Sequence, residues 1–283
     1  MSIRTDLAVE SLRPGAPDIP GISQSQRSGS GCQVTEVKVE TEEAAKNLSK
    51  PIGTYITIET DRLTSHPEEF EGMVVCISQE LLRLAPEKGE ILVIGLGNND
   101  ITPDALGPHV VSQILATRHL AKELPAGHEL SNLRAVSAIA PGVLGQTGIE
   151  VAEITGAVCE KTKPALVVVI DALACADIQR LGCTIQLTNT GISPGSGVQN
   201  RRKELSQNTL GVPVLAVGIP TVIDMHTIVE NMTGAPVDNE LPNMMVTPRD
   251  IDQIIQRTAR LVAFSINRAF QPSLSMEDLL SLV

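Results

Sequence analysis

The chain contains very few aromatic side chains: among its 283 residues there are no tryptophans, one tyrosine and three phenylalanines. Hydrophobic residues still make up 42% of it, so Leu, Ile, Val, Ala and Met are expected to fill a substantial core. Basic residues are also scarce, with 22 Lys and Arg against 33 Asp and Glu. The net charge of −11 argues against a nucleic-acid partner, because such surfaces need clustered positive charge.

Cysteine is sparse and irregularly placed. The five cysteines form no C-x-x-C pair and no zinc-finger spacing, and an odd, scattered set is typical of a reducing cytosol. No apolar run approaches the length of about 18 residues that a membrane span needs, and the first residues lack the apolar core of a secretory signal. The sequence therefore predicts a soluble cytoplasmic protein that has no membrane partner.

The first 33 residues differ in composition from the rest of the chain. They are rich in Ser, Gly and Pro and include the stretch SQSQRSGSG, which is typical of a flexible lead. From residue 34 onward, strand and helix patterns alternate. This alternation predicts an α/β fold, a three-layer αβα arrangement with a mostly parallel central sheet, in a single domain at 34–283.

Apolar periodicity locates the expected elements. Alternating or continuous apolar runs predict strands at 34–40, 55–59, 91–95, 133–140, 165–170, 184–187 and 214–219. Helical spacing predicts helices at 70–84, 103–122, 201–207 and 221–231, and a long one that starts at 247–250 and reaches at least 266. A capping box at Thr147–Glu150 indicates a further helix to about Lys161, and Ser275 caps a short final helix.

The stretch from Ile91 to Pro108, ILVIGLGNNDITPDALGP, combines a buried strand, a glycine loop and a helix start. Thr102 is expected as the N-cap and Pro103 as the first helical residue, which places Asp104 in the first turn, where the helix dipole favours a negative charge. Chemistry in open α/β sheets gathers at the carboxyl ends of strands. Asp104 is therefore a candidate functional residue, although an acidic residue in a first turn is common without any function.

Asp171 is the second candidate, because it directly follows the apolar run LVVVI. A turn or N-cap aspartate is the ordinary alternative at such a position. Two carboxyl groups that meet in a partly dry cleft cannot both ionise easily, so one of them keeps a proton. Asp104 and Asp171 together would form an acid/base pair around a water molecule, with Asp171 as the expected holder of the proton.

Two other chemistries fit the sequence poorly. Gly95-Leu96-Gly97 lacks the third glycine of a dinucleotide-binding loop, and position 100 is an aspartate that would repel pyrophosphate. The stretch 191–195, GISPG, matches the nucleophile pattern G-x-S-x-G, but Pro194 has no N–H for an oxyanion hole. Its expected partners, Asp224 and His226, are only two positions apart. No cofactor is expected, although a carboxylate-bound metal stays open.

Several motifs resemble those of the germination protease family, the endopeptidases that degrade small acid-soluble spore proteins. They occur in the family's order, and the resemblance is dense from about residue 92 to 224 and resumes at 245–248. The motifs are GLGN, TPDALGP, PGVLGQTGIE, IDALA, TGISPGSGV, RRKE, TLGVPVLAVGIPTV and MVTP, preceded by TDLAVE near the N-terminus.

The resemblance implies an α/β fold similar to hydrogenase maturation peptidases, a peptidase of aspartic type without the paired D-T/S-G loops of pepsin-like enzymes, and Asp104 and Asp171 as catalytic residues. It further implies synthesis as a self-processing zymogen in the spore core, a homotetramer, and residues 1–33 as prosegment and lead. The family cuts at an acidic–hydrophobic–Ala site, so TDLAVE predicts self-cleavage between Ala8 and Val9. Residues 95–99 and 191–198 are expected to be loops near the site.

The loop residues expected near the catalytic pair are Gly97, Asn98, Ser193 and Gly195. The chain departs from the family pattern in having only four residues before TDLAVE and a short connection at 225–244, so zymogen control and assembly are expected to differ. Two rival functions stay open. One is a metal-dependent maturation peptidase of the same fold, and the other is a non-catalytic binding protein.

Overall fold

The structure, a computed structural model, describes residues 5–12, 19–29, 32–60, 67–120, 129–193, 203–238 and 242–283. Nine strands of this described part form one sheet in the order β1-β2-β3-β7-β8-β6-β4-β5, and β9 pairs with the end of β8. The strands are β1 (Ile22–Gly29), β2 (Cys32–Val39), β3 (Gly53–Thr60), β4 (Ile91–Gly95), β5 (Val136–Ile139), β6 (Leu166–Cys175), β7 (Thr184–Thr188), β8 (Val214–Asp224) and β9 (Met245–Val246).

The sheet is parallel in one half and antiparallel in the other. β8, β6, β4 and β5 run parallel, whereas β1, β2, β3 and β7 form antiparallel pairs and β7 joins β8 in antiparallel fashion. The predicted α/β class is confirmed. The sheet is mixed rather than mostly parallel, because β1, β2, β3 and β7 pair in antiparallel fashion with their neighbours.

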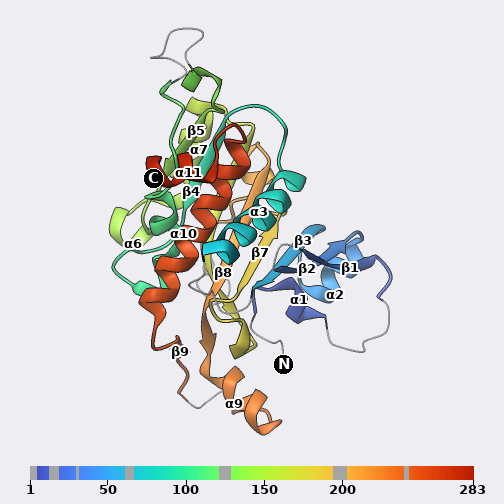
Figure 1. The fold of residues 1–283 in the computed structure, drawn as a ribbon. Helices are drawn as coiled ribbons and strands as arrows, with labels where there is room; N and C mark the ends of the chain where they lie inside the picture. Colours follow the sequence, from blue (N-terminus) through green and yellow to red (C-terminus); the bar gives the residue numbers. More distant parts are fainter. Residues whose placement is uncertain are drawn as a thin grey trace.

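Helices cover both faces of this sheet. α3 (Pro67–Leu84) and α4 (Leu106–Val111) pack against α10 (Ile251–Phe270) over one face and bury the largest apolar cluster (Figure 1). The opposite face is covered by α7 (Val151–Thr162) and α8 (Gln207–Leu210) over the parallel strands, and by α1 (Ala8–Ser11) and α2 (Glu42–Leu48) over β2 and β3. The other described α-helices are α6 (Leu144–Thr147), α9 (Met225–Thr233) and α11 (Met276–Leu282).

Residues 22–29 form β1, although the composition of residues 1–33 predicts a flexible lead. β1 pairs along its whole length with β2, from Ile22 opposite Val39 to Gly29 opposite Cys32. Most of its side chains are exposed, so backbone hydrogen bonds hold this edge strand, and its Ser- and Gln-rich sequence carries no apolar pattern. The prediction of a flexible lead is wrong for these residues.

The prediction of one long helix from Pro103 to about Lys122 is also wrong. A short 3₁₀ helix, η1 (Thr102–Asp104), comes first, and α4 is only six residues long. Asn267 of α10 stabilises the break, because its Oδ1 accepts the N–H of Leu115 and its Nδ2 donates to the carbonyl of Gln113, each at 2.9 Å. A distant helix thus satisfies backbone groups that would otherwise belong to a continued helix.

β6 and β8 are longer than predicted, and both lengthen at their carboxyl ends. β6 continues past residue 170 to Cys175, and β8 continues past residue 219 to Asp224. The helix predicted to start at residue 221 therefore begins later, as α9, with Asp224 as its N-cap. The two extended strands pair with each other beyond the end of β4, and this protruding part of the sheet carries the candidate site.

Two predicted helix starts also differ. The capping box at Thr147–Glu150 is absent: Thr147 ends α6, and α7 follows Glu150 without a side-chain cap. The helix predicted at 201–207 falls partly outside the described residues, and the chain becomes helical only at α8. The strands at 34–40, 55–59, 91–95 and 184–187, and α3, α10 and α11, are confirmed with small boundary shifts. Across the described ranges, we find no helix with the length and apolar character of a bilayer span.

Candidate active site

Asp171 lies inside β6, at the position where its neighbour β4 stops. Gly95, the last residue of β4, is opposite Ile170, so Asp171 is the first residue of β6 beyond that pairing. Side chains alternate along a strand, so Asp171 shares its face of the sheet with Val169 and Leu173. Only 7% of Asp171 is exposed. A carboxyl group is thus held on a rigid strand among apolar neighbours.

A second polar side chain lies in the same row of the sheet. Gly218 of β8 is opposite Asp171, and Gln186 of β7 is opposite Gly218. The absence of a side chain at Gly218 makes room for Leu173, since a Cβ at position 218 would lie 2.3 Å from Cδ1 of Leu173. Asp171 and Gln186 are therefore the two polar side chains of a row that crosses three strands.

Asp104 ends η1, in the loop that follows β4. Its Oδ2 accepts the backbone N–H of Asn98 at 2.8 Å, and a donated N–H stabilises a carboxylate charge. The hydroxyl of Thr221 in β8 donates to the carbonyl of Pro103 at 2.7 Å, which ties η1 to the extended part of the sheet. The loop thus brings Asp104 toward the strand that carries Asp171.

Two glycines allow this close approach of loop and helix. Gly97 has a φ of +118°, and a Cβ there would be 1.9 Å from the carbonyl oxygen of Asp104. A Cβ on Gly107, in α4, would be 2.2 Å from the carbonyl oxygen of Leu96. The glycines of this stretch therefore serve close backbone packing that places Asp104, which explains why they do not follow a dinucleotide-binding pattern.

The environment of Asp171 favours its protonated form. Burial raises the pKa of Asp171 well above its ordinary value, and the charges of Asp104 and Asp6 raise it further. The N–H of Ala172, which donates to Asp171 Oδ1 at 3.0 Å, opposes this shift. The raised pKa of Asp171 agrees with the expectation that this residue holds the proton of the pair. Its cause is mainly desolvation, with repulsion between carboxylates as the second contribution.

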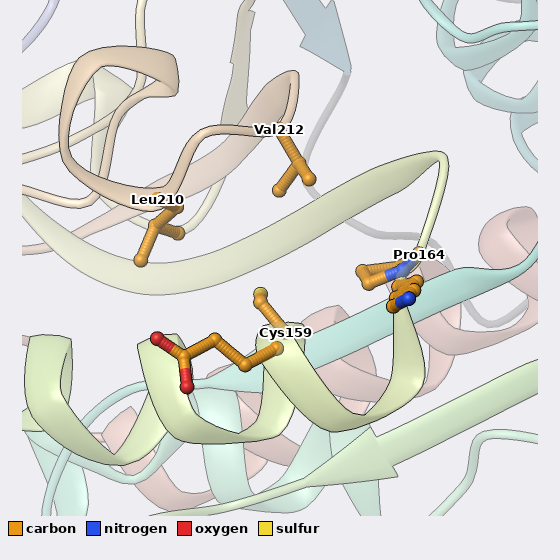
Figure 2. A pocket seen from close by; sticks show the side chains of 6 residues that line it. Cys159, Pro164, Leu210 and Val212 are labelled. Carbon is orange, nitrogen blue, oxygen red and sulfur yellow. The ribbon is translucent and has the colours of Figure 1, made fainter.

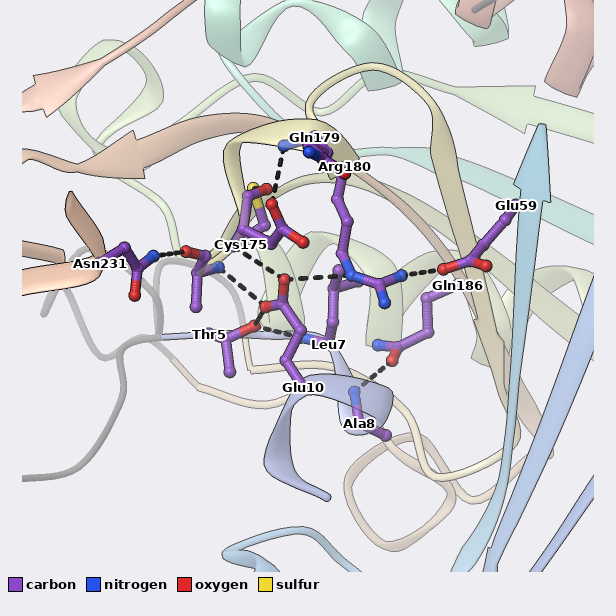
Figure 3. Close-up of polar contacts among 12 residues, drawn as sticks. Thr5, Leu7, Ala8, Glu10, Glu59, Cys175, Gln179, Arg180, Gln186 and Asn231 are labelled. Atoms are coloured by element: carbon purple, nitrogen blue, oxygen red, sulfur yellow. Dashed lines mark hydrogen bonds and ion pairs between the residues drawn. The ribbon is translucent and has the colours of Figure 1, made fainter. Parts of the chain in front are cut away.

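The segment Thr5–Glu10 lies against this part of the sheet (Figure 3). Asp6 binds β6 on the edge that β4 leaves unpaired: its N–H donates to the carbonyl of Ala174, and its Oδ2 accepts the N–H of Ala174, each at 2.9 Å. Gln186 Nε2 donates to the carbonyl of Asp6 at 3.0 Å, and Gln186 Oε1 accepts the N–H of Ala8 at 2.6 Å. The N-terminal segment is thus bound through its backbone.

Ala8 and Val9, the predicted self-cleavage residues, lie in the first turn of α1. Ala8 is fully buried, whereas Val9 is partly exposed. Leu7, just before them, is also fully buried, in a cluster with Leu173, Cys175, Leu181 and Ile223. The peptide bond between Ala8 and Val9 is therefore in a helical turn, beside the strands that carry Asp171 and Gln186.

Of the remaining predicted site residues, all but Gly195 lie in the part of the chain that the structure describes. Gly97 and Asn98 lie beside Asp104, as stated above. Ser193 follows Ile192, which bridges to Leu205, and is half-buried, whereas Gly195 lies outside the described residues. Asp224 and His226 do not act together: Asp224 caps α9, and the ring of His226 faces the carbonyl of Pro242 at 3.2 Å.

A surface pocket of about 380 Å³ lies elsewhere on the fold, between the end of α7 and the turn after α8 (Figure 2). Cys159 and Pro164 line it together with Leu210 and Val212. Pro164 is about 23 Å along the chain from Asp171 at the rise of a strand. Burial raises the pKa of Cys159, so this thiol is a poor nucleophile. Glu160 and Lys163 complete the lining of the pocket.

Sequence reasoning missed the residues that hold the N-terminal segment, namely Gln186, Lys50 and Arg180. Lys50 Nζ donates to the carbonyl of Asp6 at 2.8 Å, and Arg180 forms ion pairs with Glu10 and Glu59. The signal in the sequence is weak, because a polar residue in a strand looks like an ordinary solvent-facing position. Within the described ranges, no group of three or more His, Cys, Asp or Glu side chains is arranged to hold a metal ion.

The profile of the germination protease family matches residues 5–235. A germination protease from Caldanaerobacter subterraneus subsp. tengcongensis is 41% identical over 318 aligned positions, which cover 99% of this chain and 97% of the relative. A germination protease from Clostridium tetani is 40% identical over 320 positions, which cover 99% and 98% of the two chains.

Among solved structures, the [NiFe] hydrogenase maturation protease HycI from Thermococcus kodakarensis KOD1 is similar over 66% of this chain and 98% of its own, with a TM-score of 0.36 and 18% identity. The germination proteases are closer in sequence, with 41% and 40% identity over 99% of this chain. The chain therefore belongs to the germination protease family, a family of peptidases, as its motifs predict.

Proposed function

We propose that this protein is an endopeptidase in which Asp104 and Asp171 form the catalytic acid/base pair. The observation that carries the proposal is the buried Asp171, whose pKa is raised by burial and by the charge of Asp104. Two carboxyl groups whose environments differ can hold one proton between them, which is the arrangement that aspartic peptidases use. The family relationship supplies the reaction class, and the pair supplies the chemistry.

In this proposal, the Asp104 carboxylate accepts a proton from the attacking water, while Asp171 donates its proton to the scissile carbonyl oxygen. The tetrahedral intermediate then collapses and the C–N bond breaks: Asp104 transfers the proton that it gained to the leaving amine, and one hydroxyl of the intermediate returns a proton to Asp171 as the carbonyl forms again. The N–H of Asn98 supports the charged state of Asp104, and the apolar neighbours of Asp171 keep its proton in place. Water is consumed, and no cofactor takes part.

We also propose that the chain cuts itself between Ala8 and Val9. The segment before this bond reads acid–Leu–Ala, and it is bound to the strand that carries Asp171. Peptidases bind the bond that they cut in an extended conformation, whereas this bond lies in a helical turn. The turn must therefore open before the catalytic pair can act, which would make the intact chain a zymogen whose prosegment ends at Ala8.

The proposed substrates are the small acid-soluble spore proteins, and the proposed location is the cytoplasm of the forespore and spore. Both come from the family to which the chain belongs. A homotetramer is proposed on the same ground, and light scattering of the purified chain measures it directly. A mass equal to one chain of 30.1 kDa would contradict the tetramer and leave the catalytic proposal intact.

Two rivals make different predictions. A metal-dependent peptidase of the same fold would lose its activity in EDTA and regain it with added divalent metal, whereas the aspartate pair works in the presence of the chelator. A non-catalytic binding protein would keep its biological function when either aspartate is replaced by asparagine. Neither rival requires both Asp104 and Asp171 for cleavage, whereas the aspartate pair does.

The deciding experiment incubates the purified chain with a small acid-soluble spore protein and follows cleavage by mass spectrometry. The wild type should cut the substrate and lose its own first eight residues, whereas Asp104→Asn and Asp171→Asn should do neither. Asp252→Asn, an exposed position in the first turn of α10, is the matched control and should cut normally. Equal cleavage by the wild type and by Asp171→Asn would remove the proposal.

A further inference from the structure

Two of the five cysteines meet between the sheet and the helix α3. Cys32 is the first residue of β2 and Cys76 lies in the middle of α3, and both belong to the largest apolar cluster. Only 5% of Cys32 and 6% of Cys76 are exposed, and a hydrogen bond joins the two thiols. Cys159 and Cys175 belong to two other clusters. β2 and α3 thus hold two thiols in contact, although these residues are far apart in the chain.

Ion pairs set the register of β2 against α3 independently of the cysteines. Arg83 Nη2 lies 2.6 Å from Glu36 Oε2, and Arg83 Nη1 lies 2.6 Å from Glu80 Oε2. Cys32 and Glu36 are four positions apart, so they share one face of β2 at a separation of about 13 Å. Cys76, Glu80 and Arg83 follow one another at spacings of four and three, so they share one face of α3 over a length of about 10 Å. The register that pairs Glu36 with Arg83 therefore also brings Cys32 to Cys76.

The two thiols differ in acidity. The hydrogen bond to Cys76 and burial raise the pKa of Cys32. The same hydrogen bond lowers the pKa of Cys76, the charge of Arg27 lowers it further, and burial and the charge of Glu80 oppose the shift. Thiolates rather than thiols attack disulfides, so Cys76 is suited to react first and Cys32 to react second.

We propose that Cys32 and Cys76 form a reversible disulfide bond that links β2 to α3, with a low-molecular-weight disulfide as the oxidant. The Cys76 thiolate attacks one sulfur of the small disulfide, whose S–S bond breaks, and the leaving thiolate takes up the proton that Cys76 released. Cys32 then attacks the Cys76 sulfur of this mixed disulfide, and its proton goes to the second small thiolate as that group leaves. Two protein thiols are thus oxidised, and the small disulfide is reduced to two thiols.

The bond closes a loop that contains α2 and β3, and it joins the antiparallel half of the sheet to a helix on one of its faces. Such a link restricts the unfolded chain, so oxidation should raise the thermal midpoint by on the order of 5–10 °C. In a reducing cytosol, a disulfide of this kind is transient and forms when the compartment becomes oxidising. The inference does not rest on the proposed function, because neither Asp104 nor Asp171 lies in the linked segments.

The test incubates the folded full chain with oxidised glutathione, blocks the remaining thiols with iodoacetamide, and maps the peptides by mass spectrometry without reduction. The wild type should yield a peptide pair linked through Cys32 and Cys76, together with the rise in thermal midpoint, and dithiothreitol should reverse both. Cys32→Ala should stop at a mixed disulfide between glutathione and Cys76. Cys76→Ala should leave Cys32 unmodified, because the attacking thiolate is then missing.

The matched control is Cys159→Ala, which removes a cysteine that is also 5% exposed but belongs to another cluster. It should keep both the linked peptides and the rise in midpoint. Glutathione adducts without a link, or a link between other cysteines, would overturn the proposal. A Cys32–Cys76 link that forms only in urea would also overturn it, because the folded register would then play no part.

Discussion

Replacing Gly97 by alanine tests whether the loop after β4 positions a catalytic aspartate. A Cβ at this position would lie 1.9 Å from the carbonyl oxygen of Asp104 and 3.3 Å from its Oδ1, at a φ of +118° that strains any side chain. Since Cβ contacts below about 3 Å do not occur, the Asp104 carbonyl must withdraw by roughly 1 Å. A misplacement of about 1 Å can cost on the order of 100-fold in rate, or about 2.7 kcal/mol.

The expected result is a kcat about 100-fold lower with little change in KM, because Gln186 and Lys50, which hold the docked N-terminal segment, lie outside the altered loop. Backbone strain should lower the free energy of unfolding by about 1–3 kcal/mol, measured by denaturant titration. Gly156→Ala is the control: it lies in α7 with no atom within 4 Å of the new Cβ, and it should stabilise the protein slightly. Full activity of a folded Gly97→Ala would refute the reasoning.

Three further predictions follow from the site. Because burial raises the pKa of Asp171, ionisation of this side chain destabilises the folded state. The thermal midpoint of Asp171→Asn should therefore exceed that of the wild type by a margin that grows from about pH 4 upward and levels off above the folded-state pKa. A margin that does not depend on pH would contradict this. Leu7→Ala should weaken docking of the N-terminal segment by up to about 2–5 kcal/mol, seen as faster hydrogen exchange at residues 5–11, and unchanged exchange would disprove the anchoring role. Burial and nearby carboxylates raise the pKa of Cys175 to about 12, so iodoacetamide at pH 8 should leave peptidase activity intact, whereas rapid inactivation would indicate a thiol mechanism.

The elements that the sequence predicts well are those with strong local patterns. β4 and α10 carry uninterrupted apolar periodicity, and Ser275 caps α11 with a capping box, so their positions follow from neighbouring residues alone. The break after α4 and the strand β1 were not predictable in this way. Asn267, about 150 positions later in the chain, stabilises the break after α4. Pairing with β2 stabilises β1, whose own sequence has no apolar pattern.

The catalytic candidates show the same division. Both aspartates stand out because each follows an apolar strand pattern, and the motifs around them identify the family. The pattern places Asp171 after a strand, whereas the structure places it inside a longer one. That extension depends on pairing with β8, which comes more than 40 residues later in the chain.

Local sequence was sufficient for the α/β class and the family, and it singled out the two candidate aspartates, because strand periodicity, turn residues and ordered motifs are all short-range signals. Tertiary structure alone decided what surrounds those aspartates. The burial that raises the pKa of Asp171 and the ion pairs of Arg180 with Glu10 and Glu59 join segments that are distant in the chain, whereas the glycine contacts that place Asp104 are made within the stretch from residue 95 to 107. Such contacts depend on how the sheet and its loops pack, and a single sequence carries no direct record of that packing.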